Sequence, residues 1–136
     1  MYPQHLISTY KREPNTMKRR KFTRFRAQDD AYAALQGDFS KVGKIYDISL
    51  NGLAFRYIAR KNSDKTFNRV NIFLTNNGFH LDDVPCTIIY NVHESTSSLD
   101  GILPYRCGMK FETLNEEQQR QLEFFLDNHT TGVFDS

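Results

Sequence analysis

Two arginines four residues apart, Arg20 and Arg24, lie in the most basic stretch of the chain, residues 18–26. A guanidinium group suits phosphate recognition, because its planar fork of N–H donors can bond two oxygens at once. It also stacks on flat rings such as nucleobases. The stretch therefore predicts an anionic ligand that carries flat rings. The same spacing recurs at Arg56 and Arg60, so an arginine pair alone does not define a site.

A second polar group, residues 47–52, begins 23 positions after Arg24. Asp47 and Ser49 are two positions apart at the expected end of a strand, so their side chains leave the same face. A carboxylate can accept from the N1–H and N2–H₂ groups of guanine, whereas adenine offers an acceptor at N1. Gly52 permits a backbone turn in a conformation that other residues rarely adopt. The plainer alternative is an Asx or Ser turn that caps backbone groups.

The charges of the chain are unevenly distributed, although the net charge is only +2. The first 26 residues hold eight Lys and Arg against one Glu, and the rest holds ten cations and fifteen acids. A basic arm on a mildly acidic body fits an anionic partner such as a nucleotide, a nucleic acid or a phospholipid. Residues 1–18 show no periodicity and contain Pro3 and Pro14, so we expect a flexible basic arm. A disordered tail that only adds solubility is the alternative.

The composition, with 39% apolar and 25% charged residues in a chain of 136, is that of one globular domain. There is no apolar run long enough to span a bilayer and no secretory signal, so we expect a cytoplasmic protein without a membrane span. Cys86 and Cys107 lack the spacing and the neighbouring histidines of a metal site, and we expect both to be reduced and buried. The four histidines are scattered without a nucleophile beside them, so we expect no enzyme and no cofactor.

Short segments of alternating apolar and polar residues predict strands. They cover residues 31–35, 41–48, 53–58, 70–74, 84–92 and 105–111. In the fifth segment the alternation predicts one long apolar face, made by Val84, Cys86, Ile88, Tyr90 and Val92.

A helix is predicted after Asn115, which can cap it, with Gln118 three residues on as in a capping box. It should end near Asp127 and leave residues 128–136 as a loose tail. Together these elements predict a mainly β fold, a small six-stranded antiparallel β-barrel with a C-terminal α-helix. Closing the sheet removes its exposed edges.

The order Arg20-x-x-x-Arg24 followed by Asp47-x-Ser49-x-x-Gly52 resembles the signature of PilZ domains, which are bacterial receptors for cyclic di-GMP. Further similarity lies in the strand of residues 105–111 with its Gly-x-x-Phe, and in the helix that follows. The resemblance covers roughly residues 19–127.

The resemblance implies a six-stranded barrel without catalysis, in which Arg20 and Arg24 grip phosphates and stack on guanine. It implies that Asp47 and Ser49 contact the guanine and phosphate groups from the barrel surface, and that Gly52 shapes the turn. No enzymatic or membrane domain accompanies the motifs, so the receptor would signal to an unknown downstream protein.

Arg19 adds a third guanidinium to this stretch, one more than the two phosphates of a single cyclic di-GMP require. If the chain is extended here, Arg19 points to the opposite side from its neighbour and can reach a second ligand molecule. The alternative is that Arg19 only adds to the positive field or pairs with a nearby carboxylate.

Two other functions remain open at this point. A nucleic-acid-binding barrel could use Phe22 and Phe25 to stack bases, but the strands are not rich in exposed cations and aromatics, so nucleic acid is the less favoured partner. A protein-interaction module could dock the basic arm on an acidic partner without any ligand, and the complete Asp47, Ser49 and Gly52 pattern counts modestly against it.

Overall fold

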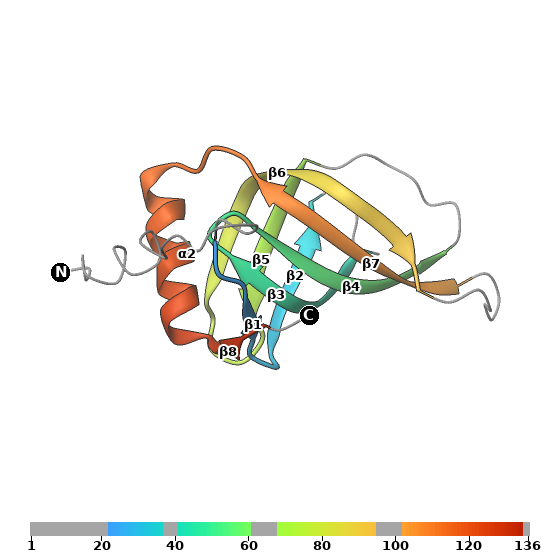
Figure 1. Ribbon diagram of the computed structural model, residues 1–136, viewed down its shortest axis with the longest axis horizontal. Coiled ribbons are helices and arrows are strands. Elements are labelled where there is room, and N and C mark those ends of the chain that lie inside the picture. Colours follow the sequence, from blue (N-terminus) through green and yellow to red (C-terminus); the bar gives the residue numbers. More distant parts are fainter. Residues whose placement is uncertain (1–21, 37–40, 61–67, 95–101, 135–136) are drawn as a thin grey trace.

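The computed structural model describes residues 22–36, 41–60, 68–94 and 102–134. Six antiparallel strands close into a barrel (Figure 1). They are β2 (Ala31–Leu35), β3 (Val42–Ser49), β4 (Gly52–Arg60), β5 (Arg69–Leu74), β6 (His80–His93) and β7 (Ile102–Phe111). The hydrogen-bonded order is β2-β5-β6-β7-β4-β3, and β2 pairs with β3 to complete the circle. The predicted fold class, a small six-stranded antiparallel barrel with a C-terminal helix, is confirmed.

The barrel interior is filled by the apolar positions of the alternating segments. In β4, Leu53, Phe55 and Tyr57 are almost fully buried, whereas Arg56 and Ile58 on the opposite face are exposed. Alternation of this kind follows from the strand itself, since successive side chains point to opposite faces. The polar positions of these strands therefore lie on the outer surface of the barrel.

The long strand β6 departs from the single apolar face that its sequence predicts. Val84 and Cys86 are buried, but Tyr90 is 39% exposed and Val92 is 53% exposed. The register with β7 shifts between Ile88 and Tyr90, which marks a β-bulge. One extra residue in a strand exchanges its inner and outer positions from that point onward. The expectation of one continuous inner face is therefore wrong beyond Ile88.

The helix α2 (Glu116–Asn128) lies across one end of the barrel (Figure 1). Its N-terminus carries the predicted capping box, in which the Asn115 side chain accepts from the Gln118 N–H and the Gln118 side chain accepts from the Asn115 N–H. The apolar side chains on one face of the helix are buried against the barrel: Leu122, Phe125 and Leu126. The helix thus seals this end of the core.

The end of the chain is more ordered than the predicted loose tail of residues 128–136. Residue 128 is still helical, and β8 (Thr130–Val133) pairs antiparallel with β1 (Phe25–Ala27), which in turn pairs with β3. Without β8, the outer edge of β1 would present unpaired N–H and C=O groups, so the backbone itself favours the added strand. The arm predicted for residues 1–18 lies outside the described residues.

Candidate functional site

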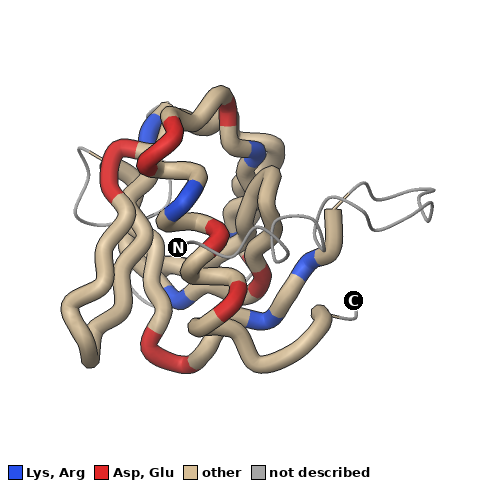
Figure 2. Tube along the Cα trace, turned by 90° about the vertical axis from the view of Figure 1, so that its left-hand side faces the viewer, with Lys and Arg blue, Asp and Glu red and all other residues tan. Residues whose placement is uncertain are grey.

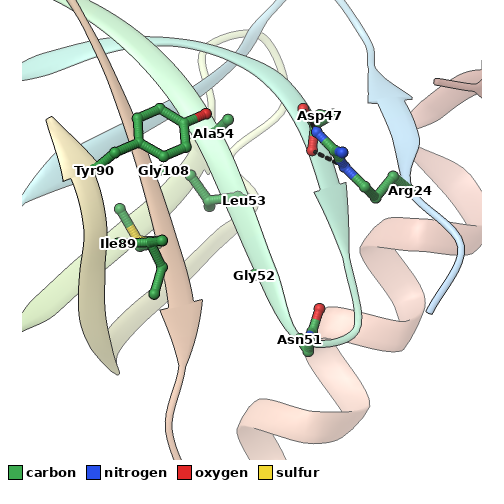
Figure 3. Close-up of a pocket in the computed structure, with 10 residues that line it drawn as sticks. Arg24, Asp47, Asn51, Gly52, Leu53, Ala54, Ile89, Tyr90 and Gly108 are labelled. Carbon is green, nitrogen blue, oxygen red and sulfur yellow. Dashed lines mark hydrogen bonds and ion pairs between the residues drawn. The ribbon is translucent and has the colours of Figure 1, made fainter. Parts of the chain in front are cut away.

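The structure brings Arg24, immediately before β1, into direct contact with Asp47 of β3 (Figure 3). The Arg24 guanidinium donates through Nε to Asp47 Oδ1 at 3.0 Å and through Nη2 to Asp47 Oδ2 at 2.8 Å. The carboxylate side chain is only 5% exposed, whereas the arginine side chain is 30% exposed. The hydrogen bonds to Asp47 raise the pKa of Arg24, so its charge is secure at any physiological pH.

A hollow of about 200 Å³ opens on the outer barrel surface beside this ion pair. Arg24 and Asp47 lie at one side of it, and Ile89 and Tyr90 lie at the other (Figure 3). Pockets that enclose a whole drug-sized ligand measure roughly 300–1,000 Å³. The hollow is therefore suited to one ring system of a larger ligand, with the remainder lying on the surface outside.

The floor of the hollow is a row of residues that runs across four neighbouring strands. Asp47 of β3 is opposite Ala54 of β4, which is opposite Gly108 of β7, which is opposite Tyr90 of β6. A Cβ at Gly108 would lie 2.3 Å from the Tyr90 ring, so the glycine allows this ring to lie across β7. Two small residues thus separate a carboxylate at one end from an aromatic ring at the other.

Tyr90 is a site residue that the sequence pattern did not indicate, because the alternation predicted that its side chain faces the core. The bulge before it turns the ring to the outer surface. A signal that could have indicated the contact is the pairing of a bulky aromatic with a strand glycine, since such a glycine often marks a close approach of another group.

Ser49 lies in the strand end beside the hollow and makes local hydrogen bonds. Its Oγ donates to Asn51 Oδ1 at 2.9 Å and accepts from the Asn51 N–H at 3.1 Å. The side chain is buried, and it is Asn51 that lines the hollow. In this structure Ser49 therefore caps a turn, which is the simpler alternative given by the sequence analysis, and it holds Asn51 at the rim of the hollow.

Gly52 is required here for a reason other than the special turn conformation expected from the sequence. Among the described glycines, Gly78 and Gly132 have positive φ, and Gly52 does not. A Cβ at Gly52 would lie 2.2 Å from the carbonyl oxygen of Met109 on β7. The glycine thus permits the close approach of β4 and β7 directly beneath the hollow.

The remaining arginines of the sequence analysis differ in their placement. Arg19 and Arg20 lie outside the described residues. Arg56 lies on the outer surface of β4 and pairs with Glu94 at 2.8 Å. It therefore has a partner of its own, away from Asp47.

Cys86 and Cys107 are buried free thiols, as predicted. Burial raises the pKa of Cys86 to about 11 and that of Cys107 to about 12, so both stay protonated at neutral pH. The described residues contain no cluster of three or more His, Cys, Asp or Glu side chains that could hold a metal ion. No helix within the described ranges is long and apolar enough to cross a membrane.

Comparison with models of protein families assigns the chain to one of them. The family model described as PilZ domain matches residues 18–128, and the chain therefore belongs to the PilZ domain family. A search of curated proteins gives no match.

Solved structures share the fold at low sequence identity. The PilZ domain with c-di-GMP of YcgR from Escherichia coli superposes with a TM-score of 0.56 at 16% identity, and the match covers 81% of this chain and 91% of that one. The K. pneumonia MrkH–c-di-GMP complex gives a TM-score of 0.58 at 19% identity, covering 82% of this chain and 52% of that one. The chain thus spans about half the length of MrkH.

Proposed function

We propose that this chain is a non-catalytic receptor for cyclic di-GMP. The observation that carries the proposal is the Arg24–Asp47 pair at the rim of a hollow with an aromatic ring on its far side, in a chain of the PilZ family. Two solved relatives in fold, YcgR and MrkH, are described with c-di-GMP, which supports the same ligand class here.

The hollow has the chemistry that a guanine base needs. Base–aromatic stacking stabilises a nucleotide by about 1–3 kcal/mol per base, and Tyr90 offers the ring. Each Asp47 oxygen has a second lone pair beyond the one used by Arg24, so the carboxylate can accept from the guanine N1–H and N2–H₂ edge as well. Gly108 lies under the Tyr90 ring, and the small Ala54 lies between that ring and the carboxylate.

The phosphates of the ligand would be bound by the arginines. Arg24 has donors besides the two that it directs to Asp47, since a guanidinium carries five N–H groups. Arg20 and Arg19 would complete the phosphate contacts, as the resemblance implies for Arg20. Binding would order the arm of residues 1–18 and signal to a downstream protein.

Trypsin digestion tests the ordering of the arm. Lys18, Arg19, Arg20 and Lys21 are cleavage sites, and clustered cations repel one another until a phosphate ligand neutralises them. We expect saturating cyclic di-GMP to slow cleavage in this stretch severalfold, while cleavage after Arg120 of α2 keeps its rate. Equal rates at residues 18–21 with and without ligand would rule the ordering out.

Isothermal titration tests both the function and the stoichiometry. At protein concentrations well above the dissociation constant, we expect two cyclic di-GMP molecules per chain. The Arg19→Leu variant should lower this ratio toward one and keep the preference for guanine, because Asp47 is unchanged. Absence of binding would refute the receptor function. A ratio of one for the unaltered chain, or a ratio of two in Arg19→Leu, would refute the role of Arg19 alone.

The nucleic-acid alternative is weaker in the described part of the chain. Figure 2 shows Lys and Arg interspersed with Asp and Glu along the trace. Binding to a polyanion favours cations gathered on one basic face, which the trace of the described residues does not show. Competition between cyclic di-GMP and a single-stranded oligonucleotide separates the two functions. The receptor function predicts that the oligonucleotide fails to displace cyclic di-GMP at equal phosphate concentration.

A further inference from the structure

The C-terminal strand β8 brings one aromatic residue against the motif arginine. The Arg24 Cζ lies over the Phe134 ring, 5.0 Å from its centre, and the Phe134 N–H donates to the Arg24 carbonyl oxygen at 2.8 Å. The Cζ of Arg26 lies 5.5 Å from the centre of the same ring. Two guanidinium groups thus contact one aromatic ring, an arrangement stabilised by cation–π attraction.

The strand order shows on which side of Arg24 this ring lies. The sheet runs β7-β4-β3-β1-β8, with Arg24 immediately before β1. The floor of the hollow belongs to β3, β4, β6 and β7, whereas Phe134 follows β8 on the other side of β1. The backbone of Phe134 therefore lies on the side of β1 away from the hollow, and Phe134 is not among the residues that line the hollow.

Arg24 is consequently held from two directions. Asp47 accepts from Nε and Nη2 along one edge of the guanidinium, and the Phe134 ring lies against the group from the β8 side. A long side chain without such contacts samples many rotamers, and ordering it on binding opposes affinity. A pre-ordered guanidinium avoids most of that loss.

We propose that Phe134 is a positioning residue of the ligand site, which acts through Arg24 and does not touch the ligand. The inference rests on the proposed cyclic di-GMP function and extends it, because it places the C-terminal residues 130–134 in the binding machinery. Sequence distance hides this link, since 110 positions separate Arg24 from Phe134.

The test compares Phe134→Leu with Phe134→Tyr by isothermal titration with cyclic di-GMP. Leucine removes the ring and should weaken binding about three- to ten-fold, whereas tyrosine keeps the ring and should stay within about two-fold of the unaltered chain. Phe124→Leu is the matched control, because this exposed phenylalanine lies on α2, packs on Phe79 and His129, and is not among the residues that line the hollow. It should leave binding unchanged.

A second measurement follows Arg24 directly in the absence of ligand. In the NMR spectrum, the Arg24 Nε–H signal should move in Phe134→Leu because the ring no longer lies beside it, and should stay near its position in Phe134→Tyr. The proposal is overturned if Phe134→Leu binds as tightly as the unaltered chain or more tightly, or if the tyrosine variant fails to restore binding. An unmoved Arg24 signal in Phe134→Leu also overturns the proposal, whether or not the unaltered chain binds cyclic di-GMP. Absence of cyclic di-GMP binding by the unaltered chain would separately refute the receptor function.

Discussion

Replacing Arg24 with alanine is expected to weaken cyclic di-GMP binding about ten- to hundred-fold. A hydrogen bond to a charged group contributes about 1.5–3 kcal/mol, and each 1.4 kcal/mol corresponds to a factor of ten in affinity. The substitution removes a phosphate ligand, and it also removes the partner of a carboxylate that is only 5% exposed. Isothermal titration measures the loss, and thermal unfolding shows whether the variant remains folded at the temperature used.

Two arginine variants serve as controls for this prediction. Arg120 lies on α2, pairs with Glu117 and is not among the residues that line the hollow, so Arg120→Ala should bind normally. Arg56 repeats the motif spacing but pairs with Glu94 on β4, and Arg56→Ala should bind nearly normally as well. If Arg24→Ala and Arg120→Ala lose affinity alike, Arg24 has no specific role in binding.

Substituting Asp47 by asparagine is expected to reduce both affinity and guanine selectivity. The amide keeps one acceptor oxygen and adds an NH₂ donor, which would face the N–H donors of Arg24 and of guanine. We expect cyclic di-GMP binding to weaken about ten-fold or more, and the preference for cyclic di-GMP over cyclic di-AMP to shrink by a similar factor.

Asp29→Asn is the matched control for Asp47→Asn. The Asp29 side chain is fully exposed and forms a 3.2 Å ion pair with Lys44, a surface pair of small energetic effect. Titrations with cyclic di-GMP and cyclic di-AMP measure the preference for guanine. If Asp47→Asn retained the full preference, Asp47 would not be the residue that selects guanine. Loss of affinity with selectivity intact would assign Asp47 to holding Arg24 alone.

The elements with a clear local pattern could be predicted from the sequence. Alternation in β4 and β5 indicates strands because one of their faces is buried, and Asn115 with Gln118 indicates the start of α2 because both side chains satisfy backbone groups nearby. The strand β8 was missed because it has four residues, and its partner β1 lies about a hundred positions earlier. Backbone pairing over that distance leaves no local periodicity.

The site was predictable only in part, for related reasons. The motif order places Arg24 and Asp47 in one candidate site, but their contact depends on the pairing of β1 with β3. The outward position of Tyr90 depends on one extra residue in β6, which apolar alternation does not reveal. The need for a glycine at position 52 depends on how closely β7 approaches, and hence on tertiary structure.

The pairing of β1 and β8 outside the closed circle divides the site into two mechanical parts. Asp47, Gly108 and Tyr90 lie on β3, β7 and β6, which pair with other barrel strands in the closed circle, so these three residues belong to the barrel frame. Arg24 and Phe134 directly adjoin a two-strand flap, β1 with β8, that is joined to this frame through the pairing of β1 with β3. The pairing of β1 with β3 can open while the six barrel strands stay paired with one another. The free energy of ligand binding can therefore drive a movement of β1 and β8 without unfolding the core.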